Sequence, residues 1–245
     1  MANSKPNQNT LSQRLHEDLA QLISDTKPGD RLPTEPELAK QLGVSRATLR
    51  EAMRTFETQG LLLRRQGVGT FVVRPTQVLD TGLEVLESID TLANRTGLPV
   101  SPGKIELEVR SASDEECSAL EIDRGCQVVS VSRVILAEDR PVAFLVDILP
   151  TDVLTPEDVK EGFSGSVLDL LLERGEPHLV NSHCEIAAVA ANSKIARALQ
   201  IQRGDAILKF SARLFAIDGR IVDSSISYFL PGYFRFHVIR ELTTK

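Results

Sequence analysis

The sequence predicts an α+β protein of two domains: a small helical N-terminal domain and a larger C-terminal domain in which helices cover an antiparallel sheet. The first 75 residues show helical periodicity and capping signals, whereas the remainder repeats itself at a shift of 79 positions. Residues 1–75 hold 11 Lys and Arg against 8 Asp and Glu, and residues 76–245 hold 17 against 26. A basic domain on an acidic one predicts that only the N-terminal domain approaches a polyanion.

The composition is typical of a globular protein in a reducing compartment, with 42% hydrophobic and 25% charged residues. Three cysteines, Cys117, Cys126 and Cys184, lack any C-x-x-C pairing, so neither a disulfide framework nor a zinc ribbon is predicted. No export signal is visible, and no run approaches the roughly 18 apolar residues of a membrane helix. We therefore expect a cytoplasmic protein without membrane spans.

Three helices are predicted in the N-terminal domain. Apolar residues at helical spacing indicate the first over 11–23. Thr34 begins the second, with Glu37 at the capping-box spacing, and Ser45 caps a third that ends near Gly60. A short helix, a glycine-containing turn and a second amphipathic helix form a helix-turn-helix unit.

Arginines lie along one flank of the third helix. Arg46 and Arg50 are near its N-terminus, the end that a recognition helix presents to base edges in the major groove. The planar guanidinium can bond bidentately to guanine or phosphate, and Thr48 can add a hydroxyl contact. The alternative is an exposed helix face on which the arginines pair with neighbouring glutamates, and for Arg54 the two alternatives stay open.

The segment LLLRRQGVGTFVV, residues 61–73, predicts a β-hairpin with a Gly-x-Gly tip. Gly67 and Gly69 permit positive φ angles and close approach of the backbone to another surface. A basic strand that leads into such a tip is typical of the wing of a winged helix.

The stretch GDRLPTEPELAKQLGVSRATLREAMRTFETQGLLLRRQGVGTFV resembles the winged-helix DNA-binding domain of GntR-family bacterial transcription regulators, with the likeness covering residues 11–74. Two positions depart from the family pattern: Pro36 stands where arginine is frequent, and Val68 where a basic residue is common. The resemblance implies operator contacts by Arg31, Arg46, Thr48, Arg50, Gly67 and Gly69.

The C-terminal domain contains two copies of one unit, over roughly 83–150 and 166–232. The shift of 79 aligns Leu120 with Leu199 and Gly125 with Gly204. Each copy is expected to contain a helix, a strand, a short helix and a hairpin. Two such units related by a pseudo-twofold axis leave a cleft between them, which is a default site for a small molecule.

Arginines and serines recur at matching places in the two copies. Arg133 and Arg213 are on matching hairpin strands, and Ser88 and Ser166 are near equivalent helix starts. A buried arginine beside a helix N-terminus with a free hydroxyl favours anion binding. The alternative is that the arginines are surface hairpin residues and the serines only helix caps.

The segments SRVILAEDRPVAFLVDILP and IVDSSISYFLPGYFRFHV resemble the UTRA effector-binding domain of the HutC subfamily of GntR regulators, over about 83–243. The resemblance implies a chorismate-lyase-like fold that binds a small metabolite, an anionic one among the options, between its halves. Asp223 replaces a common glutamate and Phe229 a second tyrosine, which weakens the case for a phosphosugar. The implied effector contacts are Ser88, Arg133, Ser166, Asp223, Ser227 and Tyr228.

Signals for catalysis or metal binding are weak. His178, His183, Cys184 and Glu185 are close in sequence, but His183 and Cys184 would point to opposite faces of a strand, so no metal site is expected. No G-x-S-x-G, P-loop or H-E-x-x-H motif is present, and we expect no cofactor and no catalytic residue. A chorismate-lyase-like enzyme is the alternative, which leaves the DNA-binding domain unexplained.

The sequence therefore predicts a regulator rather than an enzyme: a repressor that a small metabolite releases from a palindromic operator in double-stranded DNA. A homodimer is expected, because two recognition helices related by a dyad read a palindrome. The expected boundaries are a disordered N-terminus at 1–10, the winged helix at 11–75, a linker at 76–82 and the effector-binding domain at 83–245.

Overall fold

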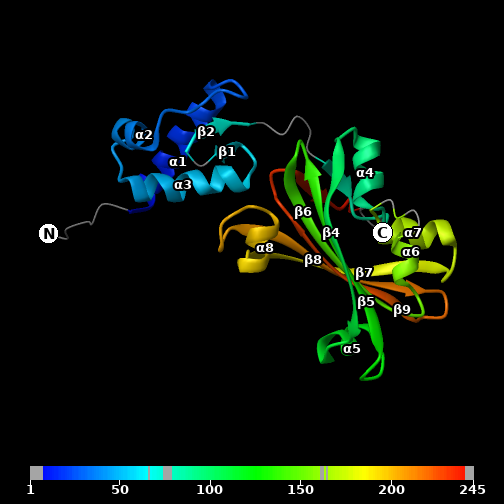
Figure 1. The fold of residues 1–245 in the computed structure, drawn as a ribbon. Helices are drawn as coiled ribbons and strands as arrows, with labels where there is room; N and C mark the ends of the chain where they lie inside the picture. Colours follow the sequence, from blue (N-terminus) through cyan, green and yellow to red (C-terminus); the bar gives the residue numbers. More distant parts are fainter. Residues whose placement is uncertain (1–7, 66, 74–78, 161–162, 164, 241–245) are drawn as a thin grey trace, which may run out of the picture. The chain divides into compact units, whose positions relative to one another are not determined.

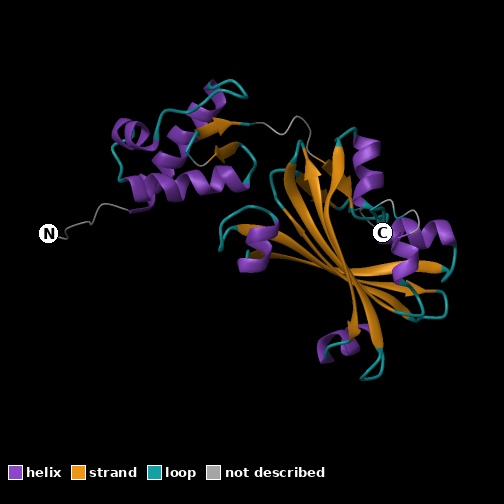
Figure 2. Ribbon diagram, viewed as in Figure 1, coloured by secondary structure: helices purple, strands orange, loops and turns teal. Residues whose placement is uncertain are grey.

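The computed structural model describes residues 8–65, 67–73, 79–160, 163 and 165–240. The chain divides after residue 76 into two compact units, and each is described by itself. The first unit is mainly helical, whereas the second is dominated by long strands (Figure 2).

The first unit has three helices and a two-stranded antiparallel sheet in its described residues. Helix α1 begins three residues before Leu11, so residues 8–10 form a helical turn rather than part of a disordered segment. The apolar periodicity that predicts this helix starts only at Leu11, and the preceding polar turn gives no such signal. The elements are α1 (Gln8–Asp25), α2 (Glu35–Gln41), α3 (Arg46–Thr58), β1 (Leu62–Arg65) and β2 (Gly69–Val72).

The predicted caps of α2 and α3 are confirmed. Glu37 Oε2 accepts hydrogen bonds from the Thr34 N–H at 2.9 Å and the Thr34 hydroxyl at 2.7 Å. Ser45 Oγ accepts from the Thr48 N–H at 3.1 Å, which starts α3 at Arg46. The apolar face of α3 is buried against α1 and α2 through Leu49, Met53 and Phe56.

The second unit contains a six-stranded sheet in which every neighbouring pair is antiparallel, in the order β4-β5-β6-β9-β8-β7. Each copy of the repeat contributes three strands, and β6 pairs with β9 where the copies meet. The strands are β4 (Val100–Ser111), β5 (Gln127–Ala137), β6 (Arg140–Pro150), β7 (Leu179–Ala190), β8 (Ala206–Ala216) and β9 (Ile221–Phe229).

Helices cover both faces of this sheet. Figure 1 shows α4, α6 and α7 on one side of it and α5 and α8 on the other. No helix of the described residues is long and apolar enough to cross a membrane. The helices are α4 (Ile89–Thr96), α5 (Asp114–Leu120), α6 (Pro156–Lys160), α7 (Val167–Arg174) and α8 (Ser193–Ala198).

Part of the expected linker is a strand. Residues 76–78 lie outside the described residues, but β3 (Leu79–Gly82) pairs in parallel with β10 (Phe234–His237). Leu79 and Thr81 are buried whereas Asp80 is exposed, the alternation of a half-buried strand. The prediction of a linker to residue 82 was wrong because a four-residue strand is too short for a periodic signal, and its partner is at the far end of the chain.

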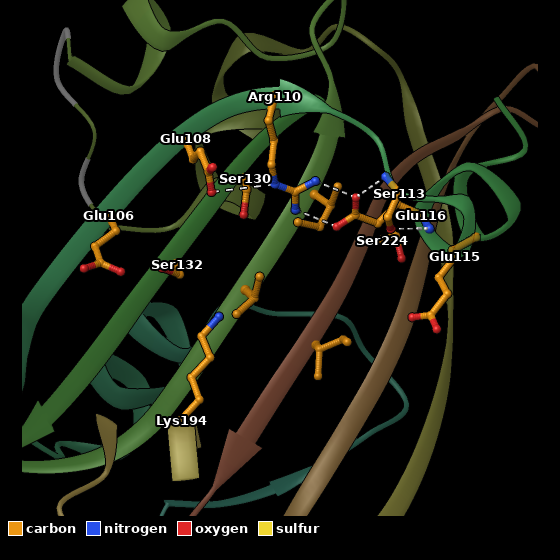
Figure 3. Close-up of a pocket in the computed structure, with 14 residues that line it drawn as sticks. Glu106, Glu108, Arg110, Ser113, Glu115, Glu116, Ser130, Ser132, Lys194 and Ser224 are labelled. Atoms are coloured by element: carbon orange, nitrogen blue, oxygen red, sulfur yellow. Dashed lines mark hydrogen bonds and ion pairs between the residues drawn. The ribbon is translucent and has the colours of Figure 1, made fainter. Parts of the chain in front are cut away.

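A charged pair fixes α5 to the edge strand β4 (Figure 3). Arg110 donates to both carboxylate oxygens of Glu116, at 2.6 and 2.7 Å. Glu116 also accepts from the Ser113 N–H at 2.9 Å, so it serves the capping box and the ion pair together. Hydrogen bonds from Arg110 and then from Ser113 outweigh partial burial and lower the pKa of Glu116 to about 2.

We predict that Glu116→Gln lowers the free energy of unfolding by about 1–2 kcal/mol at pH 7, because it removes a bidentate charge-assisted contact. A lowered carboxyl pKa stabilises the fold above the unfolded-state value, so the difference from wild type should shrink as pH falls from about 4.5 towards 2. Urea denaturation at several pH values measures this. Glu115→Gln, on the exposed neighbour, is the matched control, and equal effects of the two substitutions would contradict the assignment.

Candidate functional site

The N-terminus of α3 is an exposed polar surface. Arg46, Thr48 and Arg50 are exposed, whereas Leu49 of the same two turns is fully buried. The Thr48 hydroxyl lies 2.8 Å from the Ser45 hydroxyl. The predicted contact residues of this helix are therefore all exposed at its N-terminal end.

A single carboxylate organises two arginines next to this surface. Glu35, the first residue of α2, accepts from Arg50 Nε at 2.6 Å through Oε2 and from Arg64 of β1 through Oε1. The Glu35 side chain is only 14% exposed, whereas that of Arg50 is 49% exposed. Glu35 and Arg64 are not predictable from the sequence, because they are 29 residues apart and no spacing rule links them.

The wing glycines and Arg31 form one structure. Gly67 has φ 76° and Gly69 has φ 143°, both in the region that favours glycine. The backbone of Arg31 forms an isolated antiparallel β-bridge with Phe71, and its side chain lies so close to Gly69 that a Cβ there would clash with Nε. Gly69 therefore makes room for Arg31 beside the wing, and the predicted contacts of the wing are close together.

Arg54 differs from the other two arginines of α3. Its Nη1 donates to Glu51 Oε2 at 3.1 Å, one turn back on the same helix, and its side chain is 25% exposed. This is the intrahelical pairing of the alternative interpretation.

A cavity of about 600 Å³ opens on the face of the sheet that carries α4 and α7, within the 300–1,000 Å³ typical of small-molecule sites. Its apolar walls include Phe210, Phe229 and Phe236. Five of the six predicted effector contacts line it: Ser88, Arg133, Ser166, Asp223 and Ser227.

Tyr228 does not share this cavity. Along β9 the lining residues are Asp223, Ser225, Ser227 and Phe229, and successive side chains of a strand point to opposite faces. Tyr228 is therefore on the other face, where it pairs across the strands with Phe144 and stacks on its ring. The sheet therefore separates Tyr228 from the other five predicted contacts.

Three buried charges form a diagonal row on the cavity floor. Arg133 of β5 lies opposite Leu145 of β6, and Asp147 is two residues further along β6. Asp147 lies opposite Ser225 of β9, and Asp223 is two residues before Ser225. Their exposures are 6%, 7% and 6%. Arg133 Nη2 is 3.4 Å from Asp147 Oδ2, at ion-pair distance but without a hydrogen bond, and Phe163 lies against the guanidinium.

The surroundings of these carboxyls favour their protonated forms. Burial raises the pKa of Asp147, with attraction to Arg133 opposing it. The pKa of Asp223 lies well above its usual range, because burial is reinforced by repulsion from Asp147 and only partly opposed by Arg133. Asp90 of α4 is half-buried nearby, and burial raises its pKa against the attraction of Arg133.

Both predicted serines cap helices and also line the cavity. Ser88 Oγ accepts from the Thr91 N–H at 2.9 Å and donates to Asp169 Oδ2 at 2.6 Å. Ser166 Oγ accepts from the Asp169 N–H at 3.1 Å. Asp169 thus joins the N-termini of α4 and α7 at the cavity. Arg213, the matching hairpin arginine, does not line the cavity: it is half-buried opposite Ser224 and His183, on the other face of the sheet.

A second cavity, of about 360 Å³, lies on that opposite face (Figure 3). Its central charges are already paired, since Glu116 occupies Arg110. Figure 3 shows Glu106, Glu108 and Lys194 around it. None of the unpartnered buried side-chain atoms found in the described residues belongs to this cavity.

The histidine and cysteine cluster is divided by the sheet. Cys184 lines the larger cavity opposite Ala212, whereas His183 faces Arg213 on the other side. Within the part of the chain that the structure describes, no group of three or more His, Cys, Asp and Glu side chains is placed to hold a metal ion.

Comparison with known proteins gives two family matches. Residues 9–72 match bacterial regulatory proteins of the gntR family, and residues 95–235 match the UTRA domain. The crystal structure of PhnF from Mycobacterium smegmatis is similar in fold, with a TM-score of 0.62 and 21% identity over 93% of this chain and 99% of that one.

Curated relatives extend over most of the chain. The histidine utilization repressor of Pseudomonas aeruginosa is 31% identical, over 84% of this chain and 80% of its own. The mannosyl-D-glycerate transport/metabolism system repressor MngR of Escherichia coli is 28% identical over 97% of both chains. These relatives are transcription repressors and not enzymes, which removes the enzyme alternative. The chain belongs to the GntR family as a transcription regulator that combines a GntR DNA-binding domain with a UTRA domain.

Proposed function

We propose that this protein is a repressor that a small metabolite releases from its operator. One observation carries the proposal: the chain combines an exposed, arginine-bearing N-terminus on α3 with a separate 600 Å³ cavity that has buried charges on its floor. Relatives named for mannosyl-D-glycerate and for histidine utilization support a small polar metabolite as the effector. Release requires that the effector bind the DNA-competent arrangement more weakly than another.

We also propose a finer assignment of the fold of each unit. The α2–α3 pair and the β1–β2 hairpin support a winged helix-turn-helix, and the shared element order of the two halves supports a chorismate-lyase-like domain. The proposed DNA contacts are Arg31, Arg46, Thr48, Arg50, Gly67 and Gly69. The proposed effector contacts are Ser88, Arg133, Ser166, Asp223 and Ser227, with Asp147 added.

We also propose that the protein acts in the cytoplasm as a homodimer. One recognition helix reads only a few base pairs, whereas two related by a twofold axis read a palindrome. Sedimentation equilibrium at micromolar concentration is expected to give twice the chain mass. A monomer that binds one half-site with full affinity would contradict the dimer.

Arg46→Ala and Arg50→Ala should each weaken operator binding by about 1–3 kcal/mol, because each removes a bidentate donor to base or phosphate. The measurement is fluorescence anisotropy with a duplex that the protein has selected from a random pool. Circular dichroism checks that both variants keep the helical signal of wild type.

Arg54→Ala is the control for these two, because Arg54 is paired with Glu51 along the helix. Its operator affinity should stay within twofold of wild type.

Wild-type affinity should fall steeply with salt, since phosphate contacts release counterions. Unchanged binding by both Arg46→Ala and Arg50→Ala would refute the docking of α3.

Arg133→Ala should abolish the response to effector and keep operator binding, because Arg133 is on the cavity floor and outside the DNA-binding unit. The effector is first found by thermal-shift screening, since a ligand of the native state raises the melting temperature. Arg213→Ala, on the matching strand but the opposite face, is the paired control. A normal response in Arg133→Ala would refute the site.

A further inference from the structure

Four buried polar atoms of the cavity floor have no hydrogen-bond partner. They are Arg133 Nε and Nη1, Asp147 Oδ2 and Asp223 Oδ1. In the described residues, no other buried side-chain nitrogen or oxygen was found without a hydrogen-bond partner. Buried polar groups are nearly always satisfied, and each exception costs free energy. The three side chains that carry these two donors and two acceptors line one cavity, so unused bonding capacity is concentrated at its floor.

The fold itself does not need these charges. The hairpins β5–β6 and β8–β9 can be aligned on one pair of facing residues in each: Ile135–Ala143 in the first and Leu214–Asp223 in the second. This alignment shows which other residues of the two hairpins correspond. By that equivalence Arg133 corresponds to Ala212, and Asp147 corresponds to Ser227. Each charged position has an uncharged counterpart in a hairpin of the same shape, so the charges serve the cavity.

The balance of charge limits what can fill this cavity. One guanidinium faces Asp147 and Asp223 on the floor, with Asp90 close by. An anion alone would satisfy Arg133 but would leave the carboxyl groups of Asp147 and Asp223 without a partner. A neutral polyol would supply hydrogen bonds but no charge to pair with the charged side chains. A cation alone would leave the Arg133 donors without a partner. A molecule with both charges would offer a partner to the arginine donors and to the carboxyl acceptors.

We propose that the effector is a zwitterion, whose protonated amine lies between Asp147 and Asp223 and whose anionic group binds Arg133. The inference rests on the proposed effector function of this cavity. The diagonal row spans neighbouring strands that are about 4.8 Å apart, so the two charges of the effector are a few bonds apart. The aromatic walls, which include Phe210 and Phe229, accept its apolar part.

The test is a thermal-shift panel on the full-length protein, built from triads that share a carbon skeleton. Each standard amino acid is compared with its deaminated acid and its decarboxylated amine, and glucosamine 6-phosphate with glucose 6-phosphate and glucosamine. Neutral polyols complete the panel. At least one zwitterion should bind at least about tenfold more tightly than both single-charge members of its triad, since a site that pairs a polar group rejects analogues without it.

Asp223→Asn tests the role of the carboxylate directly. Binding of the selected zwitterion should weaken at least about tenfold, and the melting temperature of the ligand-free protein at pH 7 should equal or exceed that of wild type, because a buried, repelled carboxylate is removed. Glu185→Gln, an exposed carboxylate on the opposite face, is the control. A lower ligand-free melting temperature in Asp223→Asn would overturn the inference, since Asp223 would then serve the fold.

Operator binding is measured in the same samples, which separates two kinds of failure. A wild-type protein that binds no duplex would refute the proposed function. Intact operator binding with a purely anionic or neutral compound as the tightest ligand would refute only the zwitterion. A panel in which no compound stabilises the protein would also refute it.

Discussion

The antiparallel pairing of β6 with β9 is the constraint on which the cavity depends. It joins the two halves into one sheet and places Asp147 opposite Ser225, diagonal to Asp223. Strand side chains alternate between faces, so a slip of one residue would move Asp147 to the other face and break the row with Arg133. The apolar neighbours Leu145 and Phe229 hold this register through their burial.

Assembling charges at such a place has a thermodynamic cost. The row is buried in the sheet, and the raised pKa of Asp223 expresses how strongly that site opposes a second negative charge. The pKa of Asp147 and that of Asp223 are raised in the folded state. Their contribution to the free energy of unfolding is therefore fully present below the unfolded-state pKa and is lost as pH rises through the folded-state pKa. These carboxyl groups therefore lower the stability of the ligand-free fold, and a ligand that pairs with them can restore it.

Local signals predicted most of the fold, and long-range contacts account for most of what was missed. Ser45 and Glu37 were recognisable because capping acts over three residues. The β3–β10 pairing and the Glu35–Arg64 contact join distant segments that no local rule relates. Asp147 did leave a signal, as a single charge within the apolar run AFLVDIL. The alternation of β9 likewise excluded Tyr228 from the face of Asp223 and Ser227.

The chain's path suggests how occupancy of the cavity reaches the N-terminal domain. β3 is the first described element after the division between the units, and Leu83, Glu87 and Ser88, which follow it, line the cavity. Ser88 also begins α4 and is bonded to Asp169 of α7. An effector bound at the proposed site on Arg133 would therefore contact the segment that follows the DNA-binding unit. A difference in effector affinity between two positions of this segment is what the release mechanism requires, and no ligand contact with the N-terminal domain is needed.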